Sequence, residues 1–191
     1  MEADWAAEIG PRLDRIDASW SGFIDLRRDP QAIAAVPEAT DRAALRDALG
    51  LLNSSDSPVF TSRCDFWSLA SDEVDPFEYD FPPGEASIGF ASYIDLVARD
   101  PELFASFDLH ESWVRAAALR LRELPVASGR ADLVIRAALD REAAGFGVTL
   151  YAAGCGRDAA SAQTAWEAIL HAAVKATMGE ALHTRASSSI G

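Results

Sequence analysis

The stretch of sequence that decides the fold runs from residue 131 to residue 178 and reads ADLVIRAALDREAAGFGVTLYAAGCGRDAASAQTAWEAILHAAVKATM. Its first half contains two segments, residues 131–140 and 146–153, in which apolar residues occupy every second position. Strict alternation of this kind is typical of a strand with one buried face. The polar residues 141–145 between the two segments end in Gly145 and predict a tight connection, so we expect a β-hairpin.

A helix is expected to follow this hairpin directly. Gly154-Cys155-Gly156 ends the second strand, and Asp158 is placed to cap a helix over residues 159–182. Apolar residues recur there at helical spacing, and they are Trp166, Ile169, Leu170, Ala173, Val174 and Met178. We expect this stripe to pack on the apolar face of the hairpin and to form the core that the rest extends. That face consists of Leu133, Ile135, Val148 and Leu150.

Residues 1–55 are expected to form a helical N-terminal region. The apolar residues Trp5, Ile9, Leu13, Ile16 and Trp20 are spaced three or four apart, as on one side of a helix. Gly10-Pro11 interrupts this stripe, so the pattern predicts a short first turn and then a helix from Pro11 to about residue 26. Asp29-Pro30 and Thr40 are placed to begin two further helices.

Residues 56–183 are expected to supply the sheet and its helices. We expect strands at residues 60–69, 77–81 and 87–98, with a bulge at Gly89, and a main helix at residues 109–124 that Asp108 caps. The short strand 77–81 lies between prolines, which confines it to a sheet edge. Connections this short favour an α+β fold with an antiparallel or mixed sheet of four to five strands and two main helices on one face. Residues 1–183 then form one domain and residues 184–191 a flexible tail.

The composition narrows the classes of function. The chain has 191 residues, of which 49% are hydrophobic, enough for a single domain with its own core. Its formal net charge of −13 repels phosphate backbones, so we expect no nucleic-acid partner. The sequence shows no leader of basic and apolar residues and no apolar run of membrane-spanning length, so we expect neither export nor a membrane. Cys64 and Cys155, without a CxxC motif, are expected as free thiols in the cytoplasm.

Residues 154–159, GCGRDA, have the form GxGxxA of the dinucleotide-binding fingerprint. That fingerprint requires a further parallel strand with an acidic residue about 20 residues on, where a helix is expected instead. A glycine-rich turn from strand to helix therefore explains these glycines. A reactive thiol at Cys155, at the start of the helix, is the alternative to a small buried cysteine.

Metal sites are not indicated by the spacing of the possible ligands. His171 and His183 are twelve residues apart in the sequence, which corresponds to about 18 Å along one helix and is too far for a shared ion. The carboxylates of residues 72–80 lack the glycine and the spacing of an EF-hand. We therefore expect no metal and no cofactor.

The acidic and aromatic segment of residues 72–85 is the first candidate binding site. Aromatic side chains lose little entropy when a partner immobilises them, and carboxylates steer a basic partner towards them. The candidate contact residues are Phe77, Glu78, Tyr79, Asp80 and Phe81. The alternative is that the rings belong to the core and the charges keep an edge strand soluble.

The sheet face opposite the helices is the second candidate. Alternation in the expected strands places charged, polar and aromatic residues there, namely Arg63, Asp65, Trp67, Tyr93, Asp95, Arg136, Thr149 and Tyr151. Such a face suits a ligand pocket or a partner surface. The alternative is that residues 1–55 cover it and its charges pair with one another.

These observations favour a non-enzymatic acidic binding protein of the adaptor, chaperone or inhibitor type. Its expected partner is a more basic protein, with a second copy of the chain as the alternative. The competing function is a small enzyme or small-molecule-binding domain that uses the polar and aromatic sheet face. In the order of its elements alone, the chain resembles the small acidic secretion chaperones, with no motif in common.

Overall fold

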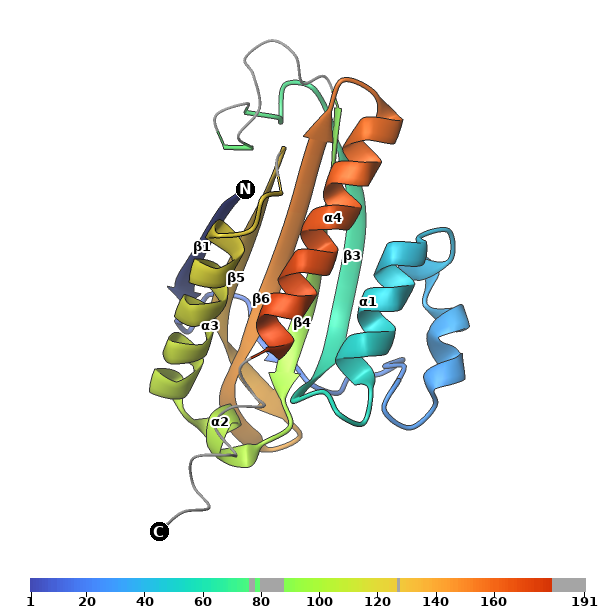
Figure 1. Ribbon diagram of the computed structural model, residues 1–191. Coiled ribbons are helices and arrows are strands. Elements are labelled where there is room, and N and C mark those ends of the chain that lie inside the picture. The colour runs from blue at the N-terminus through green and yellow to red at the C-terminus, as the bar shows by residue number, and fades with distance from the viewer. Residues whose placement is uncertain (76–77, 80–87, 127, 180–191) are drawn as a thin grey trace.

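The computed structural model describes residues 1–75, 78–79, 88–126 and 128–179. Its centre is a mixed sheet, as expected, but with six strands rather than four to five. Their order is β1-β5-β6-β4-β3, with β2 beside β5 (Figure 1). The strands are β1 (Glu2–Glu8), β2 (Ile16–Asp17), β3 (Val59–Leu69), β4 (Ile88–Ala98), β5 (Gly129–Asp140) and β6 (Ala143–Gly156). The helices are α1 (Ala43–Asn53), α2 (Pro101–Ala105), α3 (Phe107–Arg122) and α4 (Ala159–Met178), with short 3₁₀ helices η1 (Pro30–Ala35) and η2 (Pro37–Ala39).

The expected hairpin is confirmed as β5 and β6, but its connection is shorter than expected. The turn is Arg141-Glu142, with Arg141 at a φ of 58°, and Gly145 lies inside β6 opposite Ala138. The two strands are antiparallel, with Leu133 opposite Leu150 and Ile135 opposite Val148. All four side chains are fully buried on the face that the helices cover. The register follows from the alternation, because a shift of one residue would turn every apolar side chain of a strand to the other face.

Helix α4 packs on this hairpin as expected. Asp158 caps it by accepting a hydrogen bond from Ser161 N at 2.8 Å. Trp166 is completely buried, and its Nε1 donates to Ser92 Oγ on β4 at 2.9 Å. The glycines of the GxGxxA pattern allow this approach, because a Cβ on Gly154 would lie 2.7 Å from the Cα of Trp166.

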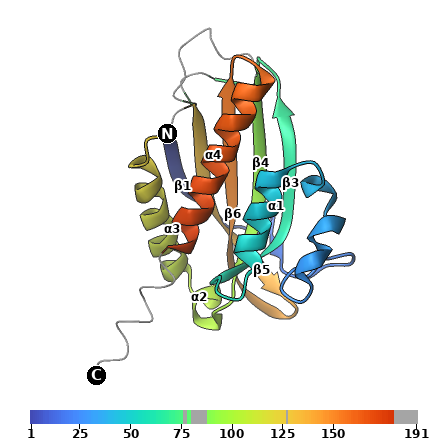
Figure 2. The ribbon, with the colours of Figure 1, turned by 45° about the vertical axis from the view of Figure 1, so that its right-hand side comes forward.

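Helices α1 and α3 cover the same face of the sheet (Figures 1 and 2). Helix α3 lies beside α4 over β1 and β5, and α1 lies on the other side of α4 next to β3. Ser106, rather than Asp108, caps α3 by accepting from Leu109 N at 3.3 Å. Within the described residues, no helix is long and apolar enough to cross a membrane.

In the N-terminal region, the expected first turn and the expected helix from Pro11 to about residue 26 are wrong, whereas η1 and α1 lie where the two further helices were expected. Residues 2–8 form strand β1, and residues 11–26, all of them described, contain no helix. Ile9, Leu13 and Trp20, whose spacing suggested one, are at least 43% exposed. Strand β1 instead pairs in parallel with β5, where Ala3 lies opposite Ala131. The backbone groups along the edge of β5 provide partners that override a weak helical pattern.

Two smaller expectations in the sheet are also wrong. Glu78 and Tyr79 form a turn rather than a strand, and Glu78 N donates to Asp75 O at 3.0 Å. Residues 77, 80 and 81 of that expected strand lie outside the described residues. Gly89 pairs regularly with Leu69 and Cys155, and the irregularity lies instead in β3, between Thr61 and Cys64.

Candidate functional site

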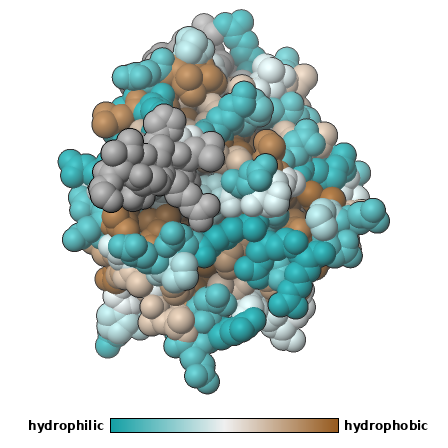
Figure 3. All heavy atoms as spheres, turned by 60° about the horizontal axis from the view of Figure 1, so that its bottom comes forward, coloured by the Kyte–Doolittle hydropathy of each residue, from teal (hydrophilic) through white to brown (hydrophobic). Residues whose placement is uncertain are grey.

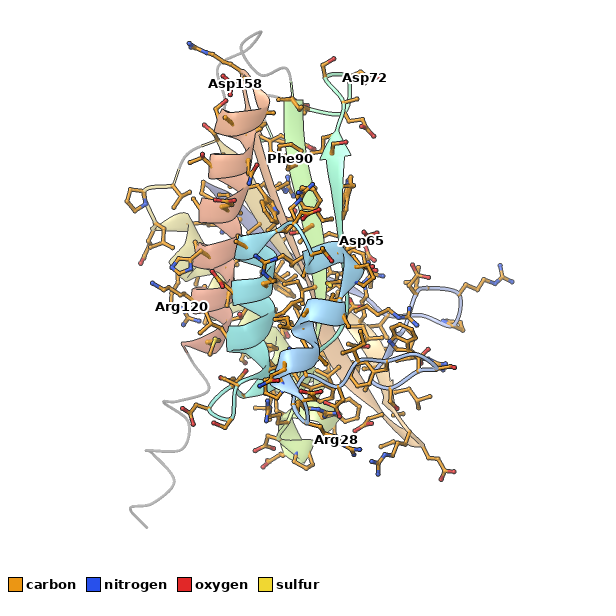
Figure 4. All side chains as sticks on the ribbon, turned by 90° about the vertical axis from the view of Figure 1, so that its right-hand side faces the viewer. Arg28, Asp65, Asp72, Phe90, Arg120 and Asp158 are labelled. Carbon is orange, nitrogen blue, oxygen red and sulfur yellow. The ribbon has the colours of Figure 1, made fainter. Side chains whose placement is uncertain are left out.

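The face of the sheet opposite the helices carries a continuous set of polar and aromatic side chains, which we call the polar face. Adjacent strands place these residues side by side, because Asp65 pairs with Tyr93, Tyr93 with Tyr151, and Tyr151 with Asp132. Figure 4 shows Asp65 on the side of the sheet away from α4, whereas Phe90 lies between the sheet and α4. The polar face consists of Arg63, Asp65, Trp67, Tyr93, Asp95, Arg130, Asp132, Arg136, Thr149 and Tyr151.

A row of three aromatic rings crosses the polar face over β3, β4 and β6. The ring centroids of Trp67 and Tyr93 are 6.4 Å apart, and those of Tyr93 and Tyr151 are 6.1 Å apart. Both tyrosines are partly buried, while Trp67 is 37% exposed. The row therefore offers π-electron faces to a ligand at the surface of the sheet.

The arginines of the polar face are paired with carboxylates of the same chain. Arg130 Nε lies 2.6 Å from Asp132 Oδ2, and Arg136 Nη2 lies 2.8 Å from Glu8 Oε2 on β1. Arg136 also donates to Tyr151 Oη at 3.3 Å, which holds this ring at the end of the aromatic row. Arg63 is more loosely placed, 3.8 Å from Asp17.

Asp95 is the buried carboxylate of the polar face. Its side chain accepts a hydrogen bond from Thr149 Oγ1 at 2.6 Å, and the residue is 7% exposed. Burial raises the pKa of Asp95, although the hydrogen bond from Thr149 and the charges of Arg63 and Arg136 favour the ionised form. Asp95 therefore lies beneath the face and offers no surface contact of its own.

Residues 9–30 cover one end of the polar face. Ile16 and Ala18 are buried in a small core with Phe60 and Val97 on that side of the sheet. Trp20 extends this cover, because its Nε1 donates to Ser62 O at 3.4 Å and its ring lies 5.7 Å from the Arg63 guanidinium. The expected cover by residues 1–55 is therefore present at the β2 end. The aromatic row, with its partly exposed Trp67, lies towards the opposite end of the strands.

A pocket of about 340 Å³ lies at the end of the polar face away from β2. Residues of both candidate sites, the polar face and the acidic segment, line it. Trp67, Tyr151 and Asp132 line it from the sheet, and Glu78 and Tyr79 line it from the acidic segment. Tyr79 is buried against Val74 and Cys155, so its ring contributes a wall to the pocket, and Glu78 is exposed.

Arg130, Asp132 and Glu8 also contribute to the polar face or its ion pairs, and they were not among the residues expected there. Arg130 and Asp132 share the alternation of Arg136, so extending that pattern backwards along β5 would have found both. Glu8 had no such signal, because its position depends on a strand that was expected to be a helix.

Neither cysteine thiol is activated by its surroundings. Burial raises the pKa of Cys155 to about 11 and, together with nearby carboxylates, that of Cys64 to about 12, so both thiols stay protonated. In the part of the chain that the structure describes, no group of three or more His, Cys, Asp or Glu side chains is placed to hold a metal ion.

Comparisons with protein-family models, with curated proteins and with solved structures found no match to this chain.

Proposed function

We propose that this protein binds a basic segment of a protein partner over the aromatic row of the polar face. The observation that carries the proposal is the row Trp67–Tyr93–Tyr151 with the carboxylate of Asp65 beside it. Among the described residues Asp65 forms no ion pair, whereas Arg130 and Arg136 are both paired. Arg63 lies on the same face but is held only loosely, 3.8 Å from Asp17. Asp65 is therefore a carboxylate beside the row that remains available to a cation of a partner.

A lysine or arginine side chain suits such a surface for two reasons. The face of an aromatic ring attracts a cation, by about 0.5–1 kcal/mol at an exposed site. A carboxylate next to the ring adds a charge-assisted hydrogen bond. Over a longer range, the net charge of −13 steers basic partners towards the protein.

The test uses synthetic decapeptides in which lysine alternates with valine, threonine or tyrosine, and matched peptides with glutamate in place of lysine. Isothermal titration calorimetry should show binding of lysine peptides only, with an affinity that falls as salt is added. Asp65→Asn should weaken binding about two- to fivefold, the loss of one exposed charge contact.

Asp47→Asn is the matched control, because Asp47 is an exposed residue of α1 on the helical side of the molecule. It removes the same charge far from the aromatic row and should leave the affinity within a factor of about two. Equal effects of the two substitutions would mean that only the net charge matters, and would contradict a site at the row.

The pocket beside the row supports a second candidate function, the binding of a small molecule. Its lining combines the rings of Trp67, Tyr79 and Tyr151 with the charges of Glu78, Arg130 and Asp132. Ala153 also lines it, so Ala153→Leu would fill part of the space. If a small molecule is the ligand, a thermal-shift screen should yield a stabilising compound that Ala153→Leu no longer binds. Peptide binding that Ala153→Leu leaves unchanged favours the protein partner instead.

A further inference from the structure

Strand β3 forms one edge of the sheet, and its two halves differ in how that edge is covered. In the first half, the side chains of Asn53 and Trp20 take its backbone groups. Asn53 Oδ1 accepts from Thr61 N at 3.1 Å, and Trp20 Nε1 donates to Ser62 O at 3.4 Å. The first half of the edge is therefore closed by the chain itself.

This cover stops at the irregularity between Thr61 and Cys64. Beyond it, Phe66 N–H donates to Oδ1 of the adjacent Asp65 at 2.7 Å, so this N–H points away from β4. Alternate residues of an antiparallel strand direct their backbone groups to the same side. The backbone groups of Cys64 and Ser68 therefore face outwards with those of Phe66, and within the described part of the chain no residue bonds to them. In Figure 4, the helical turns of residues 30–53 lie in front of the lower part of β3. The upper part of β3, which continues to Asp72, is not crossed by them.

The opposite edge of the sheet is protected differently. On β1, Arg122 reaches over from α3 and donates through Nε to Ala3 O at 2.6 Å. The same guanidinium lies 3.2 Å from Asp4, which itself accepts from Trp5 N at 2.8 Å. A side chain from a packed helix thus bonds to the backbone of β1. Among the described residues, the outward backbone groups of Cys64, Phe66 and Ser68 have only the carboxylate of Asp65, which accepts from Phe66 N.

We propose that an extended, basic segment of the partner adds to residues 64–68 of β3 as a further strand. This inference rests on the function proposed above and gives its mode of binding. An added strand supplies a carbonyl for Phe66 N–H, which releases the Asp65 carboxylate to pair with a lysine or arginine of that strand. Alternate side chains of the strand then lie beside Trp67 on the polar face.

Charge decides which strand can bind. Glu38 and Asp41 line a pocket of about 180 Å³ next to Phe66, on the helical side of this edge. Arg42 in the same pocket is already engaged, with its guanidinium 4.3 Å from the centre of the Phe66 ring. Carboxylates thus border the edge on both sides of the sheet. A second copy of β3 would bring the Asp65 residues and their acidic neighbours together, and like charges across paired strands are destabilising.

Ser68→Pro tests the inference directly. Proline at this position removes the outward N–H of Ser68 but leaves every hydrogen bond between β3 and β4 in place. Edge strands tolerate proline at such positions. Ser68→Ala, which keeps this N–H, is the matched control at the same exposed position. With the lysine decapeptides as probes, Ser68→Pro should weaken binding about tenfold and Ser68→Ala hardly at all, as expected for a lost hydrogen bond and disturbed strand pairing. Thermal unfolding of both variants checks that the fold is retained.

Methylation of alternate backbone nitrogens of the peptide gives a second test that leaves the protein unaltered. A strand that adds to β3 needs its N–H groups, so peptides methylated on one of the two sets of alternate nitrogens should lose binding at unchanged charge. If lysine peptides bind but neither methylation nor Ser68→Pro weakens them, strand addition is wrong and the proposed function stands. If lysine peptides have no advantage over glutamate peptides, the proposed function itself is wrong. A dimer in sedimentation analysis that Ser68→Pro dissociates would show that a second copy uses this edge, and would overturn the inference.

Discussion

Replacing Gly154 with alanine tests how closely α4 lies on the sheet. A Cβ at this position would lie 2.7 Å from Ala165 C and from Trp166 Cα, and nearer still to Trp166 N. All three are backbone atoms, so no side-chain rotation relieves the overlap and α4 must move away from β6. Such a movement loosens the packing of Trp166, which is completely buried. We expect a loss of about 3 kcal/mol in the free energy of unfolding, at the upper end of the usual cost of overpacking.

Gly50→Ala is the matched control, because a Cβ on Gly50 meets nothing within 4 Å. Gly50 is an exposed residue inside α1, where alanine is favoured over glycine by about 0.5–1 kcal/mol, so this variant should be more stable than the parent. Urea unfolding at 25 °C, followed by tryptophan fluorescence with unchanged m-values, measures both. If Gly154→Ala costs less than about 1 kcal/mol, the glycines do not serve helix packing and the explanation given for the GxGxxA pattern fails.

Three further predictions concern the core and the buried titratable groups. Leu150→Ala should lower the free energy of unfolding by about 2–5 kcal/mol in the same urea assay, because Leu150 is fully buried between the hairpin and α4; a loss below about 1 kcal/mol would contradict the assigned face. Cys64 and Cys155 should resist alkylation by iodoacetamide at pH 8 in the folded protein, because their pKa values are raised to about 12 and about 11. Both should react after unfolding in urea, and mass spectrometry that then finds fewer than two alkylated cysteines would contradict free thiols. The folded-state pKa of Asp95 is raised by burial, so its contribution to stability is present at low pH and is lost as the pH rises through that pKa. Asp95→Asn, which keeps an acceptor for Thr149, should therefore gain stability relative to the parent between pH 4 and pH 7, and a constant difference over this range would show that ionisation of Asp95 costs nothing.

The sequence predicts correctly those parts of the fold in which the buried face of a strand or helix follows from its own residues. Leu133 and Ile135 alternate with Asp132 and Arg136, and this alternation alone determines which side of β5 meets α4. The capping of α4 by Asp158 is likewise local, because donor and acceptor are three residues apart. The predicted set on the polar face lies together for the same reason, since strand alternation was correct in β3, β4, β5 and β6.

Only the tertiary structure determines which segments pair with, or cover, the edge strands of the sheet. Glu2–Glu8 has a weak helical pattern of its own, and only the unpaired side of β5 makes it a strand. The ion pair between Glu8 and Arg136 follows from that pairing and cannot be read from residues 128 positions apart. The closed first half of β3 likewise depends on Asn53 and Trp20, which reach it from two different segments. Side-chain periodicity depends on residues that are close together in the sequence. The segment that covers a strand edge can come from any part of the chain, and which segment does so depends on the free energy of the whole assembled sheet.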